Sequence, residues 1–298
     1  MKIVVAGASG LIGGALVPAL RGAGHEVVRL VRREAAGADE VTWNPAAGAL
    51  DGGRLEGVEA VINLCGENVG AGRWTKARRE RILRSRVEST RTLVTACAKL
   101  GHKPAVFLNA SAVGFYGDAG EEELSEETGA GLGFLPETCL IWETNAEGAK
   151  RAGIRTVLLR FGVVLAPNGG ALAKMLPLFR LGLGGRLGDG RQWWSWVSLD
   201  DAVGAIHHAL TDGRCSGPVN VVAPAAVTNA EFAATLAQVL DRPAAFPVPG
   251  FLLRLLFGRM AQETVLASAQ VRPERLSASG YGFRHEKLDA ALRHLLGK

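Results

Sequence analysis

The chain has 298 residues, of which 48% are apolar and 21% are charged, so it can bury a sizeable core and contains no polar tract that predicts disorder. The net charge of +5 is modest and suits an acidic small molecule as well as a nucleic acid. Four widely spaced cysteines (Cys65, Cys97, Cys139 and Cys215) form no CxxC pair, which excludes zinc-finger spacing and predicts reduced thiols in the cytoplasm.

Strand and helix patterns alternate through the first two-thirds of the chain. Runs rich in β-branched residues predict strands at 2–7, 26–31, 40–43, 59–66, 105–112 and 155–165, and the intervening patterns predict helices at 11–23, 73–100 and 136–152. Further helices are expected at 171–181, 200–211 and 228–240, with a late strand at 218–223. The tail from residue 249 is expected to contain two or three short helices.

This alternation predicts an α/β fold of the Rossmann type, which is a doubly wound parallel sheet with helices on both faces. We expect residues 1–165 to form an NADP-binding domain to which the strand at 218–223 returns. Residues 166–298 are expected to form a smaller C-terminal α/β substrate lobe with a helical tail.

The apolar run PGFLLRLLFG in the tail is too short to cross a membrane, and Arg254 interrupts it. No other run reaches 18 apolar residues, and the N-terminus lacks the long apolar region of a signal peptide. The sequence therefore predicts a cytoplasmic protein with no membrane partner.

The segment VVAGASGLIGG places three glycines three residues apart, between the first strand and the first helix. Residues without a Cβ let the backbone approach a pyrophosphate, and the helix that follows points its free N–H groups at that phosphate. Because the triplet follows a strand and opens a helix, it predicts a dinucleotide site. A purely structural tight turn is the alternative.

The end of the second strand reads RLVRRE, with Arg32 and Arg33 where an NAD site places an acidic residue for the ribose 2′-hydroxyl. An arginine fork suits a phosphate, so this pattern favours NADP(H). Ser9, in the glycine loop, is expected to add a hydroxyl.

Residues 73–91 carry eight basic residues and only two acidic ones. Three interpretations remain open: the solvated face of a long helix, an edge that faces a phosphate, and direct nucleic-acid binding. The third is disfavoured because no aromatic residues lie between the basic ones.

The glycine spacing, the stretch FLNASAVGFYG and the segment GDGRQWWSWVSLDD resemble the extended short-chain dehydrogenase/reductases. The segments NLCGENVGAGRW, CLIWE, LLRFGVVLAPNGGAL and VRPERLSASGYGF are similar to those of one atypical subgroup, labelled epimerase-family or SulA-like. The resemblance covers nearly the whole chain.

The resemblance implies a set of cofactor contacts. It assigns the phosphate loop to Gly7, Ser9, Gly10, Leu11 and Ile12, the 2′-phosphate contact to Arg32, the lining of the adenine-ribose side to Leu64 and Cys65, and a further cofactor contact on the long helix to Arg86.

The resemblance also shows a departure in the catalytic relay, where ordinary members carry a tyrosine and, four residues later, a lysine. Here those positions hold Cys139 and Glu143, so the standard proton relay is absent. We expect Glu143 to hold the ribose hydroxyls without helping chemistry. Ser111 matches the catalytic serine, and Tyr116 is either a second proton donor or a buried tyrosine below the pocket. Any turnover should then depend on Ser111, Tyr116 or solvent, and should be slow.

A second departure concerns the substrate. Trp194 replaces the arginine that helps nucleotide-sugar enzymes hold a diphosphate, and Ser195 replaces an aspartate. Trp193, Trp194 and Trp196 form either a core hinge between the domains or an aromatic pocket for a substrate other than a nucleotide sugar.

Three hypotheses of function follow. The first is an NADP(H)-dependent oxidoreductase or epimerase that acts on an unknown small molecule with a non-standard active site. The second is a non-catalytic NADP(H)-binding protein that reports redox state. The third, nucleic-acid association, is the weakest.

Overall fold

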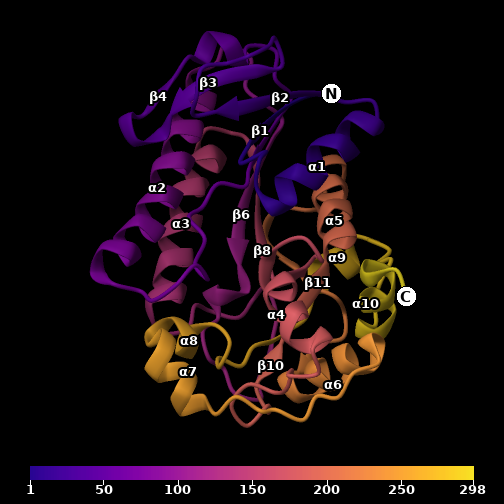
Figure 1. Cartoon of the computed structure of the whole chain (residues 1–298). Helices are drawn as coiled ribbons and strands as arrows, with labels where there is room; N and C mark the ends of the chain where they lie inside the picture. Colours follow the sequence, from indigo (N-terminus) through magenta and orange to yellow (C-terminus); the bar gives the residue numbers. More distant parts are fainter.

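The structure is a computed structural model that describes residues 1–298, and its centre is an eight-stranded sheet (Figure 1). The strand order is β12-β8-β6-β5-β1-β2-β3-β4, and every neighbouring pair except β3 and β4 is parallel. The strands are β1 (Lys2–Ala6), β2 (Glu26–Val31), β3 (Glu40–Asn44), β4 (Ala49–Leu50), β5 (Ala60–Asn63), β6 (Val106–Ala112), β8 (Arg155–Phe161) and β12 (Gly217–Val221). This sheet confirms the predicted Rossmann-type fold.

Ten helices surround the sheet and the lobe beneath it. They are α1 (Leu11–Gly22), α2 (Lys76–Lys99), α3 (Phe134–Arg151), α4 (Gly170–Arg180), α5 (Leu199–Thr211), α6 (Asn229–Leu240), α7 (Gly250–Phe257), α8 (Arg259–Glu263), α9 (Glu274–Ala278) and α10 (Leu288–Leu296). The last four lie in the tail, where the sequence predicted two or three. None of the helices is long and apolar enough to cross a lipid bilayer.

The sheet is buried on both faces because successive side chains of a strand point to opposite sides. In β1, Ile3 and Val5 pack with α1 and α5, whereas Val4 and Ala6 belong to the cluster that contains side chains of α2 and α3. Figure 1 shows these two helix pairs on either side of the strands. This layering explains the continuous apolar runs in the sequence.

The direction of winding reverses between β1 and β5. From β1 the chain proceeds to β2 and β3 on one side, and it then returns to β5, β6 and β8 on the other. In a doubly wound sheet, ligands bind outside the carboxyl ends of the strands at such a switch point. The residues that follow β1, β2, β5 and β6 are therefore the ones to examine for a site.

The predicted strand at 155–165 is interrupted at Gly162. β8 ends at Phe161, and Val163–Leu165 forms β9, which pairs with β11 (Trp196–Ser198) outside the main sheet. A Cβ on Gly162 would lie 2.6 Å from the carbonyl oxygen of Ser195, so only glycine lets the two backbone segments lie this close. At Gly162 the chain therefore leaves the main sheet and enters the lobe.

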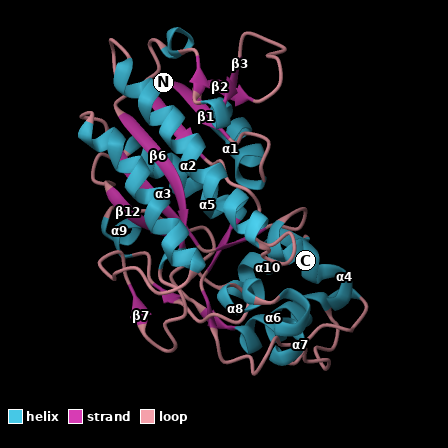
Figure 2. Ribbon diagram, turned by 90° about the vertical axis from the view of Figure 1, so that its left-hand side faces the viewer, coloured by secondary structure: helices cyan, strands magenta, loops and turns pink.

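The lobe has its own core, formed by side chains of α4, α6, α10 and the tryptophan segment. Short strand pairs frame it: β10 (Trp193–Trp194) pairs with β13 (Val227–Thr228), and β14 (Gln270–Val271) pairs with β7 (Glu123–Leu124). Figure 2 shows this lobe below the sheet.

Asp201, in the first turn of α5, ties the tail to the rest of the fold. Its carboxylate accepts hydrogen bonds from the backbone N–H groups of Arg284 (2.7 Å) and His285 (3.0 Å). The hydroxyls of Ser198 (2.7 Å) and Tyr281 (3.2 Å) also donate to it. The residue is 1% exposed, and its charge is compensated only with these donors in place.

Candidate functional site at the carboxyl edge of the sheet

The loop between β1 and α1 is shaped by glycines that no other residue can replace. Gly7 has a φ of +82°, and a Cβ there would lie 2.8 Å from the carbonyl carbon of Leu64. A Cβ on Gly13 would lie 2.3 Å from the carbonyl oxygen of Gly7. The loop therefore lies directly against the end of β5, at the switch point of the sheet.

The loop and the first turn of α1 present donors that have no acceptor within the chain. Gly10 precedes the helix without a side-chain cap, and the first turn contains no acidic residue. The first N–H group of the helix with a backbone partner is that of Gly14, which donates to Gly10, so those of Leu11, Ile12 and Gly13 are free. The exposed Ser9 hydroxyl is also unpartnered. Free N–H groups at the positive end of a helix dipole make an anion site.

The two arginines after β2 differ in their partners. Both terminal nitrogens of Arg33 lie 2.7 Å from the carboxylate of Glu40, and this hydrogen bonding lowers the pKa of Glu40. Arg32 is exposed and forms no hydrogen bond or ion pair. Of the two arginines expected to form a fork, Arg33 already has a bidentate acidic partner, so its contact with a phosphate stays a prediction. Arg32 alone is available for a phosphate.

Leu64 and Cys65 follow β5 and are both partly buried. The Leu64 N–H donates to Ala6 on β1 (2.9 Å), which fixes the backbone beside the glycine loop. Burial raises the pKa of the Cys65 thiol to about 12, although the positive charge of Arg32 opposes this shift. Cys65 is thus a neutral lining residue within the field of Arg32.

Arg86 reaches from α2 to the ends of β5 and α3. One of its terminal nitrogens donates to the carbonyl oxygens of Glu67 (3.1 Å) and Ile82 (2.9 Å). The guanidinium lies over the Trp142 ring at 4.9 Å, and a Cβ on Gly66 would lie 3.1 Å from it. The other two nitrogens of Arg86 have no partner within the chain.

At the relay positions, by contrast, the polar side chains bind one another. Ser111 donates to Glu143 (2.6 Å), and Arg160 on β8 forms two 2.8 Å hydrogen bonds with the same carboxylate. Arg160 also donates to the Tyr116 hydroxyl (2.9 Å), which itself donates to Asn220 (2.8 Å). All five residues are at most 6% exposed.

This network bears on two expectations. Arg160 and Ser111 already donate to both oxygens of the Glu143 carboxylate, and a contact from Glu143 to ribose hydroxyls stays a prediction. Tyr116 is the buried tyrosine of the second interpretation, and burial raises its pKa even though Arg160 opposes the shift. Burial likewise raises the pKa of the Cys139 thiol to about 11.

Arg160 is a residue that the sequence interpretation missed. A signal was present, because an arginine inside an otherwise apolar strand requires a buried partner, and Glu143 interrupts the apolar face of α3. Pairing the two would have predicted that the position of the relay lysine holds one half of a structural ion pair.

The profile of the NAD dependent epimerase/dehydratase family matches residues 3–222. This chain belongs to that family. Epimerase family protein Mb2239 of Mycobacterium bovis is 44% identical over 290 residues, which cover 97% of this chain and 96% of that protein. Human epimerase family protein SDR39U1 is 35% identical over 299 residues, covering 99% and 100% of the two chains.

Solved structures of the epimerase family agree with the fold. The crystal structure of human SDR39U1 isoform 2 with NADPH has a TM-score of 0.91 and 34% identity, and the match covers 100% of both chains. MoeE5 in complex with UDP-glucuronic acid and NAD has a TM-score of 0.78 at 24% identity, and that likeness shows the fold alone. Residues 248–295 match a domain of unknown function, DUF1731.

The tryptophan segment departs from the pocket interpretation. Trp194 and Trp196 are 6% and 0% exposed and belong to the core of the lobe, so both are core residues, and the hinge stays a prediction. Their indole N–H groups donate to the carbonyl oxygens of Val265 (3.2 Å) and Ala225 (2.9 Å). Neither ring is available to a substrate.

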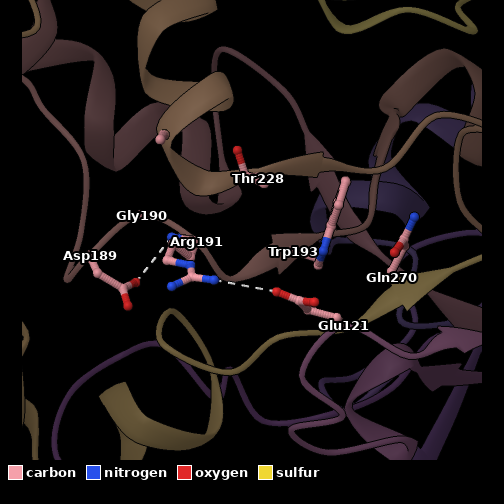
Figure 3. Close-up of a pocket in the computed structure, with 8 residues that line it drawn as sticks. Glu121, Asp189, Gly190, Arg191, Trp193, Thr228 and Gln270 are labelled. Atoms are coloured by element: carbon pink, nitrogen blue, oxygen red, sulfur yellow. Dashed lines mark hydrogen bonds and ion pairs between the residues drawn. The ribbon is translucent and has the colours of Figure 1, made fainter.

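Trp193 alone faces a hollow, of about 490 Å³, on the lobe. Figure 3 shows Arg191 between Asp189 and Glu121 in this hollow, with its guanidinium 3.5 Å from the Glu121 carboxylate. Thr228 and Gln270 complete the polar lining. No residue of the glycine loop or of the relay positions takes part, so the hollow is separate from the candidate cofactor site.

Proposed function

We propose that this chain binds NADP(H) across the switch point of its sheet, and that its relay positions carry out no acid–base chemistry. The observation that carries the first half is the contrast between Arg32 and Arg33, because only Arg32 is free to take a 2′-phosphate. The unpartnered N–H groups of α1 and the close approach at Gly7 and Gly13 fit a pyrophosphate. The crystal structure of human SDR39U1 with NADPH supports the same cofactor.

Four features would hold the cofactor. The N–H groups of Leu11 and Ile12 would bind the pyrophosphate, Arg32 the 2′-phosphate, and Cys65 would line the adenine side. Arg86, beside the residues that follow β5, would place its unpartnered nitrogens toward the nicotinamide half. Bound NADPH supplies a hydride.

Arg86 also provides the cation that the relay lacks. In ordinary members, a lysine four residues after the tyrosine holds the nicotinamide ribose. Here Glu143 occupies that position and is neutralised by Arg160, so a positive charge must come from another element. Arg86 lies close enough to Cys139 for its charge to oppose the rise in the thiol pKa.

Comparison of three ligands tests these assignments: NADPH, NADH and 2′,5′-ADP, which lacks the nicotinamide half. Arg32→Ala should weaken NADPH and 2′,5′-ADP by about 10–100-fold, the range for charge-assisted hydrogen bonds, and leave NADH nearly unchanged. Arg86→Gln should weaken NADPH and NADH but not 2′,5′-ADP. Arg84→Gln is the matched control, because Arg84 is exposed and pairs with Glu88 on the same helix. Wild-type protein that binds NADH as tightly as NADPH would overturn the proposal.

A second candidate function is an oxidoreductase or epimerase that takes its proton from solvent. It is favoured by an apolar cluster of Trp74, Phe134, Leu135 and Met260, in which Leu135 lies 3.4 Å from a Cβ on Gly114, just past β6. An apolar cluster of this kind suits an apolar carbonyl compound better than a nucleotide sugar. A single-turnover experiment separates the two functions: an enzyme consumes bound NADPH when offered carbonyl compounds, and a non-catalytic binder does not.

A further inference from the structure

Helix α7 exposes most of its large apolar side chains. Of its six leucine and phenylalanine residues, only Leu253 is buried. Phe251 and Leu255, one turn apart, are 68% and 67% exposed. We define the α7 surface by the exposed residues Phe246, Phe251, Leu255, Leu256 and Phe257. Figures 1 and 2 both place α7 at the lower edge of the molecule.

Two unpaired arginines lie on or beside α7. Arg254, within the helix, is exposed and forms no ion pair. Arg73, from the loop before α2, is the second, because its guanidinium lies 3.7 Å from a Cβ on Gly258. Arg259 is paired with Glu263 at 3.5 Å, so the unpaired charge beside the helix is positive.

We propose that the α7 surface docks on an anionic lipid bilayer. Phenylalanine and leucine side chains on a helix that lies in the plane of the membrane insert into the boundary between headgroups and acyl chains, while arginines bind the phosphates. Exposed apolar residues gathered on one helix mark an interaction site, and the unpaired charges of Arg73 and Arg254 favour a negative partner.

A second copy of the chain is a poorer occupant of this surface. In a two-fold symmetric contact, the same patch meets itself, so Arg254 of one copy would approach Arg254 of the other. Glu263, the first acidic residue after α7, already pairs with Arg259 and does not neutralise Arg254. A lipid headgroup layer supplies the missing negative charge and also accommodates side chains that protrude from a convex helix.

The proposal revises the expectation that the protein has no membrane partner. The sequence excludes a spanning segment here because the run is short and contains Arg254, and both points still hold. The structure adds that the run forms an eight-residue helix with its apolar side chains already outside the core. A helix of this length, about 12 Å, can lie on a bilayer but cannot cross it.

Flotation with vesicles of equal parts phosphatidylglycerol and phosphatidylcholine tests the proposal. Wild-type protein should float with these vesicles, and with pure phosphatidylcholine vesicles much less. The double variant Phe251→Ser/Leu255→Ser should bind at least tenfold more weakly, because two large apolar side chains no longer insert. Arg254→Gln should bind about fivefold more weakly, the contribution of one arginine near an anionic surface.

Leu140→Ser is the matched control, since Leu140 is 48% exposed on α3 and lies outside the α7 surface; it should float like wild type. All four substituted residues are exposed, so circular dichroism should show folded protein for every variant. Failure of wild-type protein to bind anionic vesicles, or equal binding by the double variant, overturns the proposal. A dimer in sedimentation that the double variant dissociates would instead identify a second copy as the occupant.

Discussion

The glycine loop and the relay positions differ in whether their polar groups have partners. At the glycine loop, the N–H groups of Leu11 and Ile12 and the guanidinium of Arg32 have none within the chain. At the relay positions, Ser111, Tyr116, Glu143 and Arg160 bind one another in a closed and buried network. Unsatisfied groups at a surface are free for a ligand, whereas satisfied and buried groups stabilise the fold. The proposed function rests on this difference between the two groups of residues.

The largest expected effect tests whether the relay end is structural. Arg160→Met leaves the Glu143 carboxylate buried without its cation and should destabilise the fold by about 3–5 kcal/mol. Urea denaturation measures the free energy of unfolding. The double variant Arg160→Met/Glu143→Met removes both charges and should recover most of the loss. If the double variant is as unstable as the single one, the shape of the site and not its charge pairing accounts for the loss.

The next largest effect tests the close packing of the backbone in the glycine loop. Gly13→Ala forces a Cβ against the Gly7 carbonyl and should cost about 1–3 kcal/mol of stability together with most of the NADPH affinity. Gly14→Ala is the control, because a Cβ there meets nothing within 4 Å. The control should be neutral or more stable by about 0.5–1 kcal/mol, since alanine favours the helix. Similar losses in both variants would refute the argument from close approach.

The order of helices and strands and the position of the cofactor loop could be predicted from the sequence for a physical reason. Periodicity reports which side chains are buried, and glycines report where a backbone approaches closely, so both signals are local. The ends of β1, β2 and α1 lie within one residue of the prediction. The break at Gly162 was missed because its cause, the Ser195 carbonyl, lies 33 positions away.

Residue partners at the site were harder to predict for the same reason. Adjacent arginines in RLVRRE look alike, and only the position of Glu40 on β3 distinguishes Arg33 from Arg32. Glu143 and Arg160 lie on a helix and a strand that the sheet brings together. A family resemblance assigns a role to Glu143 from its position in the sequence alone. The partner of its buried charge depends on which residue the fold brings next to it.

The smallest effect is a pH dependence at the relay. Burial raises the pKa of the Cys139 thiol from 9.0 to about 11, so the folded chain keeps this proton while the unfolded chain loses it. The stability from this group is therefore complete below pH 9 and falls as the pH rises toward 11. At pH 10 the loss is about 1.4 kcal/mol, the equivalent of one pH unit. Comparison of urea midpoints at pH 8 and pH 10 should show a shallower decline in Cys139→Ala.

The same substitution tests catalysis. Cys139→Ala should retain NADPH affinity and any turnover that the wild-type protein has, because burial makes this thiol a weak acid and no cation of α3 lowers its pKa. Loss of turnover with unchanged binding would identify Cys139 as the missing acid. It would then contradict the view that the relay end is purely structural.

The Asp201 carboxylate constrains the order in which this chain can fold while it is being synthesised. Two of its donors, the N–H groups of Arg284 and His285, are made 83 and 84 residues after it. Until they emerge, α5 cannot bury its first turn without leaving a charge in an apolar core, which costs several kcal/mol. Because α5 packs beside α1 on one face of the sheet, that face stays incomplete while the tail is still being translated. We therefore expect α5 to pack on this face of the sheet late. Until then, the nascent chain should depend on chaperones that bind exposed apolar surface at the ribosome.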